Sequence, residues 1–248
     1  IVTGVQTCAL PISLPPRRHA LLHLHPFRRT RPRSQGTLVR TTHGRVRPSL
    51  PPQLSLTLST SPHSASVSAH HPLGFIPVLY DLSTSPPLRL SESLAIITYL
   101  ERAHPSPPLL APTPSTLLPE RIHELASFAA SHLFPKIEFG VVKPRVAAMD
   151  EGTKSEAEIA ESVRGGVEAL KPVLRALEGM LGEGPYAVGT RITAADCMLY
   201  PPIADLKAIP EGKVLEGFIK VSAWSAFFAM TEGAKETEEG TLAVGARP

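Results

Sequence analysis

Residues 73–104 read LGFIPVLYDLSTSPPLRLSESLAIITYLERAH, and this stretch decides how the first structured part of the chain folds. It holds two short runs of strand-forming residues, 76–80 and 88–90, separated by a Pro- and Ser-rich loop, which predicts a β-hairpin. The Ser-Glu-Ser turn that follows offers N-cap residues for a helix, and Leu94, Ile97 and Leu100 recur on one face of that helix. Prolines beyond His104 end it.

The hairpin and helix resemble the second half of the thioredoxin-like, glutathione-binding domain of cytosolic glutathione transferases. The resemblance is carried by Ile76–Pro77 and by residues 92–101 (ESLAIITYLE). It implies a cis proline at Pro77, which would present the backbone of Ile76 to the cysteinyl part of glutathione as a neighbouring strand would. It also implies that Ser93 binds the γ-glutamyl carboxylate and that Glu92 binds its amino group.

Physical chemistry supports that role for the Ser-Glu-Ser turn. Free N–H groups and the positive end of the dipole attract a carboxylate to a helix N-terminus. The alternative interpretation is that Ser91 or Ser93 only caps the helix and that Glu92 only favours its first turn.

The second half of the chain has helical periodicity. A Pro-, Ser- and Thr-rich linker leads to a helix from Leu117 with an expected kink at Pro135, and a second long helix over about 154–181 contains Pro172. The expected fold class is therefore α+β, a partial thioredoxin-like domain followed by an all-helical C-terminal domain of the same family. The expected boundaries are a disordered or artefactual segment over 1–72, the partial domain over 73–110, the helical domain over 117–232 and a flexible tail over 233–248.

Thr193 and Asp196 have the spacing of a capping box that starts a buried helix. The glutathione transferases have such an element before their central helix, so the resemblance recurs in the right order a hundred residues later. The role of both residues is structural. Trp224, in a stretch that resembles the family's terminal helix, is expected in the core.

The N-terminal segment has a different composition. All 22 acidic residues lie from Asp81 onward, and without the nine arginines that precede Asp81 only 16 basic residues face them, so the formal net charge of +3 does not favour a nucleic-acid partner. Residues 2–12 (VTGVQTCALPI) resemble the translation of a sequencing adapter. Residues 14–70 cannot easily form a packed core, and the alternatives are a mitochondrial transit peptide, an Arg-rich nucleic-acid segment or a His-rich metal tract.

No catalytic residue is identified. The Tyr, Ser or Cys that acts on the glutathione sulfur in the family should lie in a strand–helix–strand unit before Leu73, and residues 13–71 show no such unit. Phe128, His132 and Phe139 are candidates for an electrophile site from their helix positions alone. Cys197, in a buried helix, is expected to be inert, and the histidines show no metal-ligand spacing.

The resemblance implies an N-terminally truncated glutathione transferase whose parent enzyme conjugates glutathione to apolar electrophiles in detoxification. The expected partners are glutathione as co-substrate, the electrophile and a second copy of the chain, with no metal, nucleic acid or membrane. A cytoplasmic location fits the family and the lone remaining cysteine. The alternatives are a non-catalytic interaction module and a Cys-type thiol transferase of the same fold.

Overall fold

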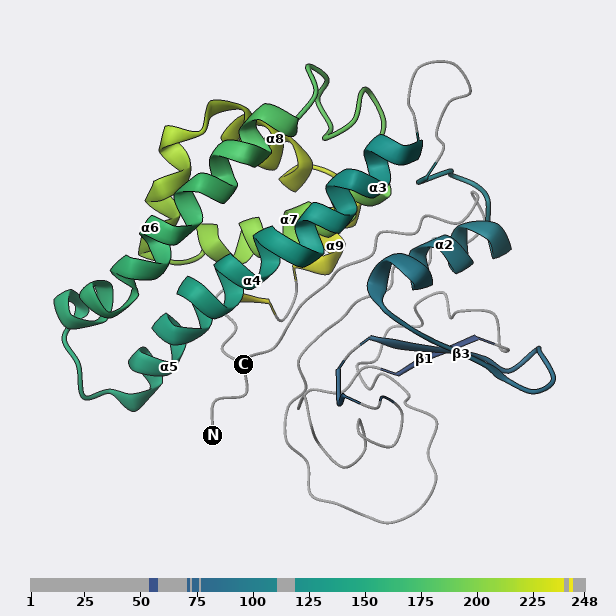
Figure 1. The fold of residues 1–248 in the computed structure, drawn as a ribbon, viewed down its shortest axis with the longest axis horizontal. Coiled ribbons are helices and arrows are strands. Elements are labelled where there is room, and N and C mark those ends of the chain that lie inside the picture. Colours follow the sequence, from purple (N-terminus) through teal and green to yellow (C-terminus); the bar gives the residue numbers. More distant parts are fainter. Residues whose placement is uncertain are drawn as a thin grey trace, which may run out of the picture.

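The computed structural model describes residues 54–57, 71, 73–75, 77–110, 119–238 and 241–242. A small antiparallel sheet with one helix against it lies beside a larger body made of helices (Figure 1). This is the predicted α+β architecture, a partial thioredoxin-like domain followed by an all-helical domain.

The sheet has the strand order β1-β2-β3, with β1 at Leu54–Thr57, β2 at Val78–Asp81 and β3 at Leu88–Ser91. The antiparallel β2–β3 pair is the predicted hairpin. β1 pairs antiparallel with β2 and lies inside the segment 1–72, for which the sequence predicts disorder or artefact. Because strand pairing satisfies backbone N–H and C=O groups whatever the side chains are, composition gives no signal for such a strand.

Helix α2 (Ser93–Ala103) packs Ile96, Ile97 and Leu100 into the core. Ile97 and Leu100 belong to the predicted face, whereas Leu94 of that face is only partly buried and Ile96 is not part of the prediction. Its last turn also anchors the linker that leaves the domain. The Glu101 carboxylate accepts the N–H groups of Leu109 at 3.0 Å and Leu110 at 2.6 Å. The Leu109 carbonyl in turn accepts the Ala194 N–H at 2.9 Å, so the linker joins α2 to the start of a helix in the second domain.

Helices α3 (Pro119–Phe128), α4 (Phe134–Ile137) and α5 (Lys143–Glu151) form one rod through the π-helical turns η1 (Ala129–Leu133) and η2 (Glu138–Val142). Each π turn ends two residues before a proline, Pro135 or Pro144. A proline has no N–H and collides with the carbonyl four residues earlier. A wider turn relieves that collision, so the rod continues where the sequence predicts a kink at Pro135.

The remaining helices are α6 (Glu156–Met180), α7 (Ala194–Lys207), the 3₁₀ helix η3 (Pro210–Gly217), α8 (Ile219–Ala229) and α9 (Glu232–Thr237). A capping box of Ser155 and Glu158 starts α6, which passes through Pro172. α9 lies in the predicted flexible tail. Its helical form has a physical basis, because the Thr231 hydroxyl accepts the Ala234 N–H at 3.3 Å and Ala234 is buried.

Asp196 is a buried carboxylate of the helical domain that accepts four hydrogen bonds. Oδ2 accepts the N–H and the hydroxyl of Thr193, each at 2.9 Å, within the capping box of α7. Oδ1 accepts the N–H of Ala187 at 2.7 Å and the indole Nε1–H of Trp224 at 2.8 Å. This single side chain therefore joins the start of α7, the loop before it and α8. Burial raises the pKa of Asp196 and its four donors oppose that rise.

A second buried acid, Glu138 in η2, lies among charged neighbours. Burial and the nearby Asp205 carboxyl, in α7, raise its pKa well above the usual range, and Lys143 acts in the opposite direction. Burial lowers the pKa of Lys143. One oxygen of Glu138, Oε1, is buried without a hydrogen-bond partner in the described part of the chain. This site therefore favours a protonated carboxyl.

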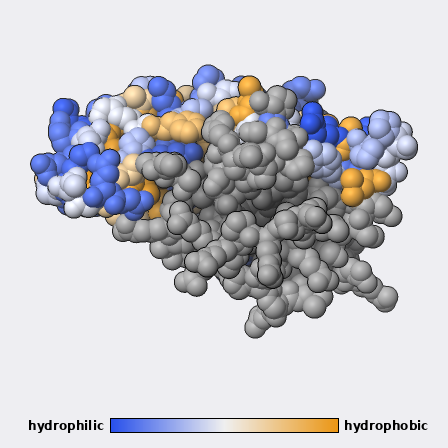
Figure 2. All heavy atoms as spheres, turned by 90° about the horizontal axis from the view of Figure 1, so that it is seen from below, coloured by the Kyte–Doolittle hydropathy of each residue, from blue (hydrophilic) through white to orange (hydrophobic). Residues whose placement is uncertain are grey.

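Much of the described surface visible in Figure 2 is hydrophilic, with hydrophobic residues in small groups. Among the described residues, the large hydrophobic side chains that are exposed are Leu73, Phe75, Leu82, Phe139, Ile219, Phe227 and Met230. No helix in the described residues is both long and apolar enough to cross a membrane.

We predict that Asp196→Ala lowers the free energy of unfolding by about 3 kcal/mol or more, because it leaves four buried donors without an acceptor. For a domain of this size that corresponds to a fall in Tm of roughly 6–12 °C in a calorimetric scan. Glu216→Ala, at an exposed position in η3, is the control and should change Tm little. An equal, small effect of both substitutions would show that the Asp196 bonds contribute no stability.

We predict that Glu138→Gln makes stability less dependent on pH. A carboxyl with a raised pKa in the folded state binds more protons than it does unfolded, so its contribution to stability is present at low pH and is lost as pH rises through the folded pKa. Glutamine removes this loss. Thermal unfolding at pH 5, 6, 7 and 8 measures this effect. Between pH 5 and pH 8 the free energy of unfolding of the variant should rise by about 1 kcal/mol or more relative to that of the wild type. Glu120→Gln, at an exposed position, is the control, and its stability should depend on pH as that of the wild type does.

Candidate functional site

The register of the hairpin brings three of the predicted site residues together. Val78 is paired with Ser91, so Pro77, one residue before β2, lies beside Glu92, one residue after β3. Ser93 then begins α2. Pro77 is buried, Glu92 is exposed and Ser93 is half-buried, so the three residues extend from the buried start of the central strand β2 to solvent.

Glu92 has an unusual backbone. It is the residue before α2, with φ 74° and ψ 119°, and it is the one non-glycine residue in the described part of the chain with a positive φ. A residue with a Cβ occupies this region at a cost of about 1–3 kcal/mol, and such residues concentrate at functional sites. Its carbonyl still accepts the Ile96 N–H at 3.0 Å, so the strained residue makes the first hydrogen bond of the helix.

The N-terminus of α2 is open to an anion. No side chain caps it and its first turn contains no acidic residue. In an α-helix the first N–H groups have no partner within the helix, and the dipole makes this end positive. A carboxylate placed at Ser93 would accept these N–H groups and the Ser93 hydroxyl.

Tyr99 holds α2 against the sheet. Its hydroxyl donates a hydrogen bond to Oδ2 of Asp81, at the end of β2. Oδ1 of Asp81 also accepts the N–H and hydroxyl of Ser83, at 2.8 and 2.6 Å. The bonds from Ser83 and Tyr99 lower the pKa of Asp81, and the same carboxylate raises the pKa of Tyr99. Tyr99 therefore positions the helix and is unsuited to activating a thiol.

Two predictions fall wholly or partly outside the described residues. Ile76 is one of them, and with it the geometry of the Ile76–Pro77 peptide bond. The other is the expectation that residues 13–71 contain no strand–helix–strand unit with a catalytic Tyr, Ser or Cys, because the structure describes only Leu54–Thr57 and His71 of that range. No catalytic residue is assigned.

The three candidates for an electrophile site separate into two groups. The rings of Phe128 and His132 lie 5.4 Å apart on successive turns of the rod. Phe139 instead packs edge-on to Phe134 at 5.9 Å, with the Lys143 ammonium 4.4 Å from its ring centre. Cys197 is buried, as expected for an inert thiol. Within the described ranges, no three His, Cys, Asp or Glu side chains are grouped to hold a metal ion.

Comparison with known proteins agrees with this geometry. Residues 156–227 match the family model of the glutathione S-transferase C-terminal domain. The helical domain of this chain is therefore similar to the C-terminal domain of glutathione transferases. The resemblance predicted from the Ile-Pro strand and the Ser-Glu-Ser helix is thereby confirmed. Comparison with curated proteins gave no match.

Solved glutathione transferases share the fold of this chain. Transferase F7 from Populus trichocarpa is 23% identical with a TM-score of 0.58, over 71% of this chain and 80% of the other. Glutathione S-transferase I bound with lactoylglutathione is 22% identical with a TM-score of 0.55, over 73% and 79%. Transferase URE2P6 from Phanerochaete chrysosporium, in complex with oxidized glutathione, is 20% identical with a TM-score of 0.54, over 72% and 78%.

We predict that Glu92→Gly stabilises the protein. Glycine occupies a positive φ at little cost, so the substitution should relieve backbone strain and raise the free energy of unfolding by about 1 kcal/mol. Glu92→Ala keeps the Cβ and is the matched control, which should leave stability nearly unchanged. Chemical denaturation of the three proteins distinguishes the outcomes. Equal stability of the glycine and alanine variants would mean that Glu92 carries no backbone strain.

Proposed function

We propose that this chain binds glutathione at the junction of β2, β3 and α2, and that it derives from an enzyme that conjugates glutathione to apolar electrophiles. The main observation in support is the strained backbone of Glu92 at the uncapped N-terminus of α2, beside Pro77. Strain held at a helix terminus that offers free N–H groups suits recognition of a carboxylate. Lactoylglutathione and oxidized glutathione bound to two structural relatives support the choice of ligand.

Each residue of the junction has a distinct role in this proposal. The N–H groups at the start of α2 and the Ser93 hydroxyl bind the γ-glutamyl carboxylate. The Glu92 side chain, which is exposed, binds the ammonium group of the same moiety. The backbone at Ile76, before Pro77, pairs with the cysteinyl part of the peptide as an added strand would.

The chemical step needs one more group. A hydrogen bond to the sulfur favours the thiolate and lowers the thiol pKa. The thiolate then forms a C–S bond to the electrophile and displaces a leaving group such as chloride. None of the residues assigned above donates to the sulfur, so the chain binds glutathione more readily than it activates it.

A non-catalytic interaction module of the same fold is the second candidate, favoured by the lack of an assigned catalytic residue. The thiol-transferase alternative needs an accessible thiolate, and Cys197 is buried. A homodimer, a cytoplasmic location and a role in detoxification belong to the proposal through the likeness to glutathione transferases.

We predict that Ser93→Ala weakens glutathione binding about tenfold, because it removes a hydrogen bond to a charged group. Thr98→Ala, an exposed position five residues further along the same helix, is the control and should bind as the wild type does. Isothermal titration calorimetry measures both. Equal affinities of the two variants, or no binding to the wild type, would contradict the proposed site.

We predict little or no turnover of glutathione with a chloronitrobenzene, followed by the absorbance of the conjugate. An intact glutathione transferase assayed in parallel is the control. Glutathione binding without turnover supports the proposal, and turnover comparable to the control would mean that an unassigned residue of this chain stabilises the thiolate.

A further inference from the structure

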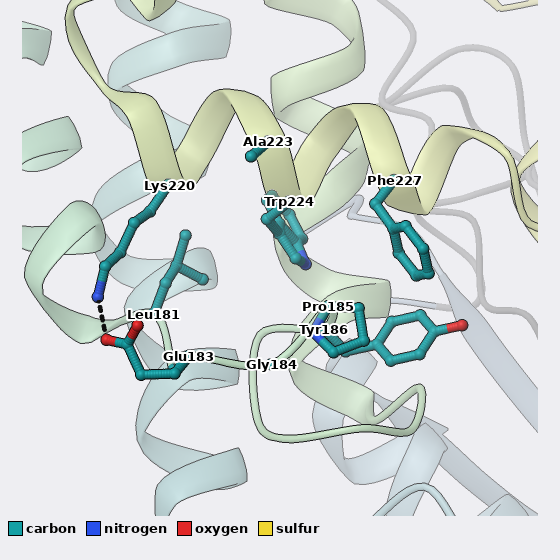
Figure 3. Close-up of a pocket in the computed structure, with 10 residues that line it drawn as sticks. Leu181, Glu183, Gly184, Pro185, Tyr186, Lys220, Ala223, Trp224 and Phe227 are labelled. Atoms are coloured by element: carbon teal, nitrogen blue, oxygen red, sulfur yellow. Dashed lines mark hydrogen bonds and ion pairs between the residues drawn. The ribbon is translucent and has the colours of Figure 1, made fainter.

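A cavity of about 320 Å³ lies between α8 and the loop that follows α6, in the helical domain (Figure 3). The loop residues 181–186 form one wall and the exposed side of α8 forms the other. None of its lining residues belongs to the proposed glutathione site. Its volume is at the lower end of the range found for small-molecule sites.

Aromatic rings dominate one end of the cavity. The rings of Tyr186, in the loop, and Phe227, in α8, meet edge to face at 5.3 Å and 76°. Trp224 lies between them and the other end, as Figure 3 shows. Its indole is 4% exposed and tied by Nε1 to Asp196 at 2.8 Å, so this wall is held in place before any ligand arrives. Flat rings of this kind favour an aromatic ligand.

The loop wall is held by its own backbone. The Gly182 N–H donates to the Ala187 carbonyl at 3.1 Å, and the Tyr186 N–H donates to the Gly189 carbonyl at 3.3 Å. The two sides of the loop approach so closely that a Cβ at Gly184 would lie 2.0 Å from the Gly189 oxygen. The cavity is therefore largely preformed, which lowers the entropic cost of binding.

The polar end of the cavity carries one charge of each sign. Lys220 Nζ lies 2.5 Å from Glu183 Oε1, in an ion pair whose side chains are 43% and 90% exposed. The pair offers a donor and an acceptor next to each other. A charged ligand would pair with one of them and repel the other, whereas a neutral hydroxyl can accept from Lys220 and donate to Glu183.

We propose that this cavity binds an uncharged, planar aromatic molecule of one or two rings that carries a hydroxyl group. The ligand ring lies against Trp224, beside the Tyr186–Phe227 pair, and the hydroxyl lies at the Lys220–Glu183 pair. The site is separate from the glutathione junction, so both ligands bind at once.

The test is a titration of the full chain with 1-naphthol, followed by NMR. Trp224 is the single tryptophan of the sequence, so the one indole N–H signal reports on the cavity. The signal should shift saturably, with the same dissociation constant in the presence of excess glutathione. 1-Naphthoate and 1-naphthylmethylammonium have a similar shape but carry a charge, and each should bind about fivefold more weakly or worse. The anion is repelled by Glu183 and the cation by Lys220.

Variants locate the ligand. Ala223→Leu fills the cavity from an exposed position of α8 and should weaken 1-naphthol about tenfold or more. Phe227→Ala, at a side chain 38% exposed, removes an aromatic wall and should have a similar effect if Ala223→Leu unfolds the chain. Met230→Ala, an exposed position just after α8 that does not line the cavity, is the control and should bind normally.

Three results would overturn the proposal. They are no shift with 1-naphthol, unchanged affinity in folded Ala223→Leu and Phe227→Ala, and displacement by glutathione. Binding of 1-naphthoate as tight as that of 1-naphthol would overturn the assignment of an uncharged ligand.

Discussion

The four hydrogen bonds to Asp196 are the interaction on which the helical domain depends. They set the start of α7, the loop before it and the position of Trp224 in α8 through one buried carboxylate. From the same helix start, the Ala194 N–H reaches the linker at Leu109, and Glu101 of α2 holds that linker from the other side. A continuous set of hydrogen bonds thus runs from the core of one domain to the helix that forms the candidate site in the other.

The backbone of Glu92 can remain strained because the elements on both sides of it are held in place. A single positive-φ residue is tolerated when the elements on both sides of it are fixed, and here β3 is paired in the sheet while α2 is packed by its buried face and tied to Asp81 through Tyr99. The strain turns the chain from strand to helix in one residue. No side chain caps the start of α2, so its first N–H groups are available to bind a ligand.

Sequence patterns predicted the elements whose signals are local. The hairpin, the periodic face of α2 and the Thr193–Asp196 spacing could all be read from neighbouring residues. The remaining features depend on tertiary context. The pairing of β1 with β2 and the raised pKa of Glu138 come from residues distant in sequence. The positive φ of Glu92 has no sequence signal, because positions that need such a backbone are normally recognised by glycine. The prolines that follow the π turns were visible, but a proline alone does not distinguish a kink from a wider turn.

The most direct test of the account is a crystal structure of this chain grown with glutathione. The account predicts the γ-glutamyl carboxylate within hydrogen-bond distance of the Ser93 hydroxyl and the first N–H groups of α2, with its ammonium group at the Glu92 carboxylate. It also predicts that the cysteinyl backbone pairs with the residue before Pro77. Glutathione bound elsewhere, or an empty junction in crystals from saturating glutathione, would contradict the assignment of this helix terminus as the binding site.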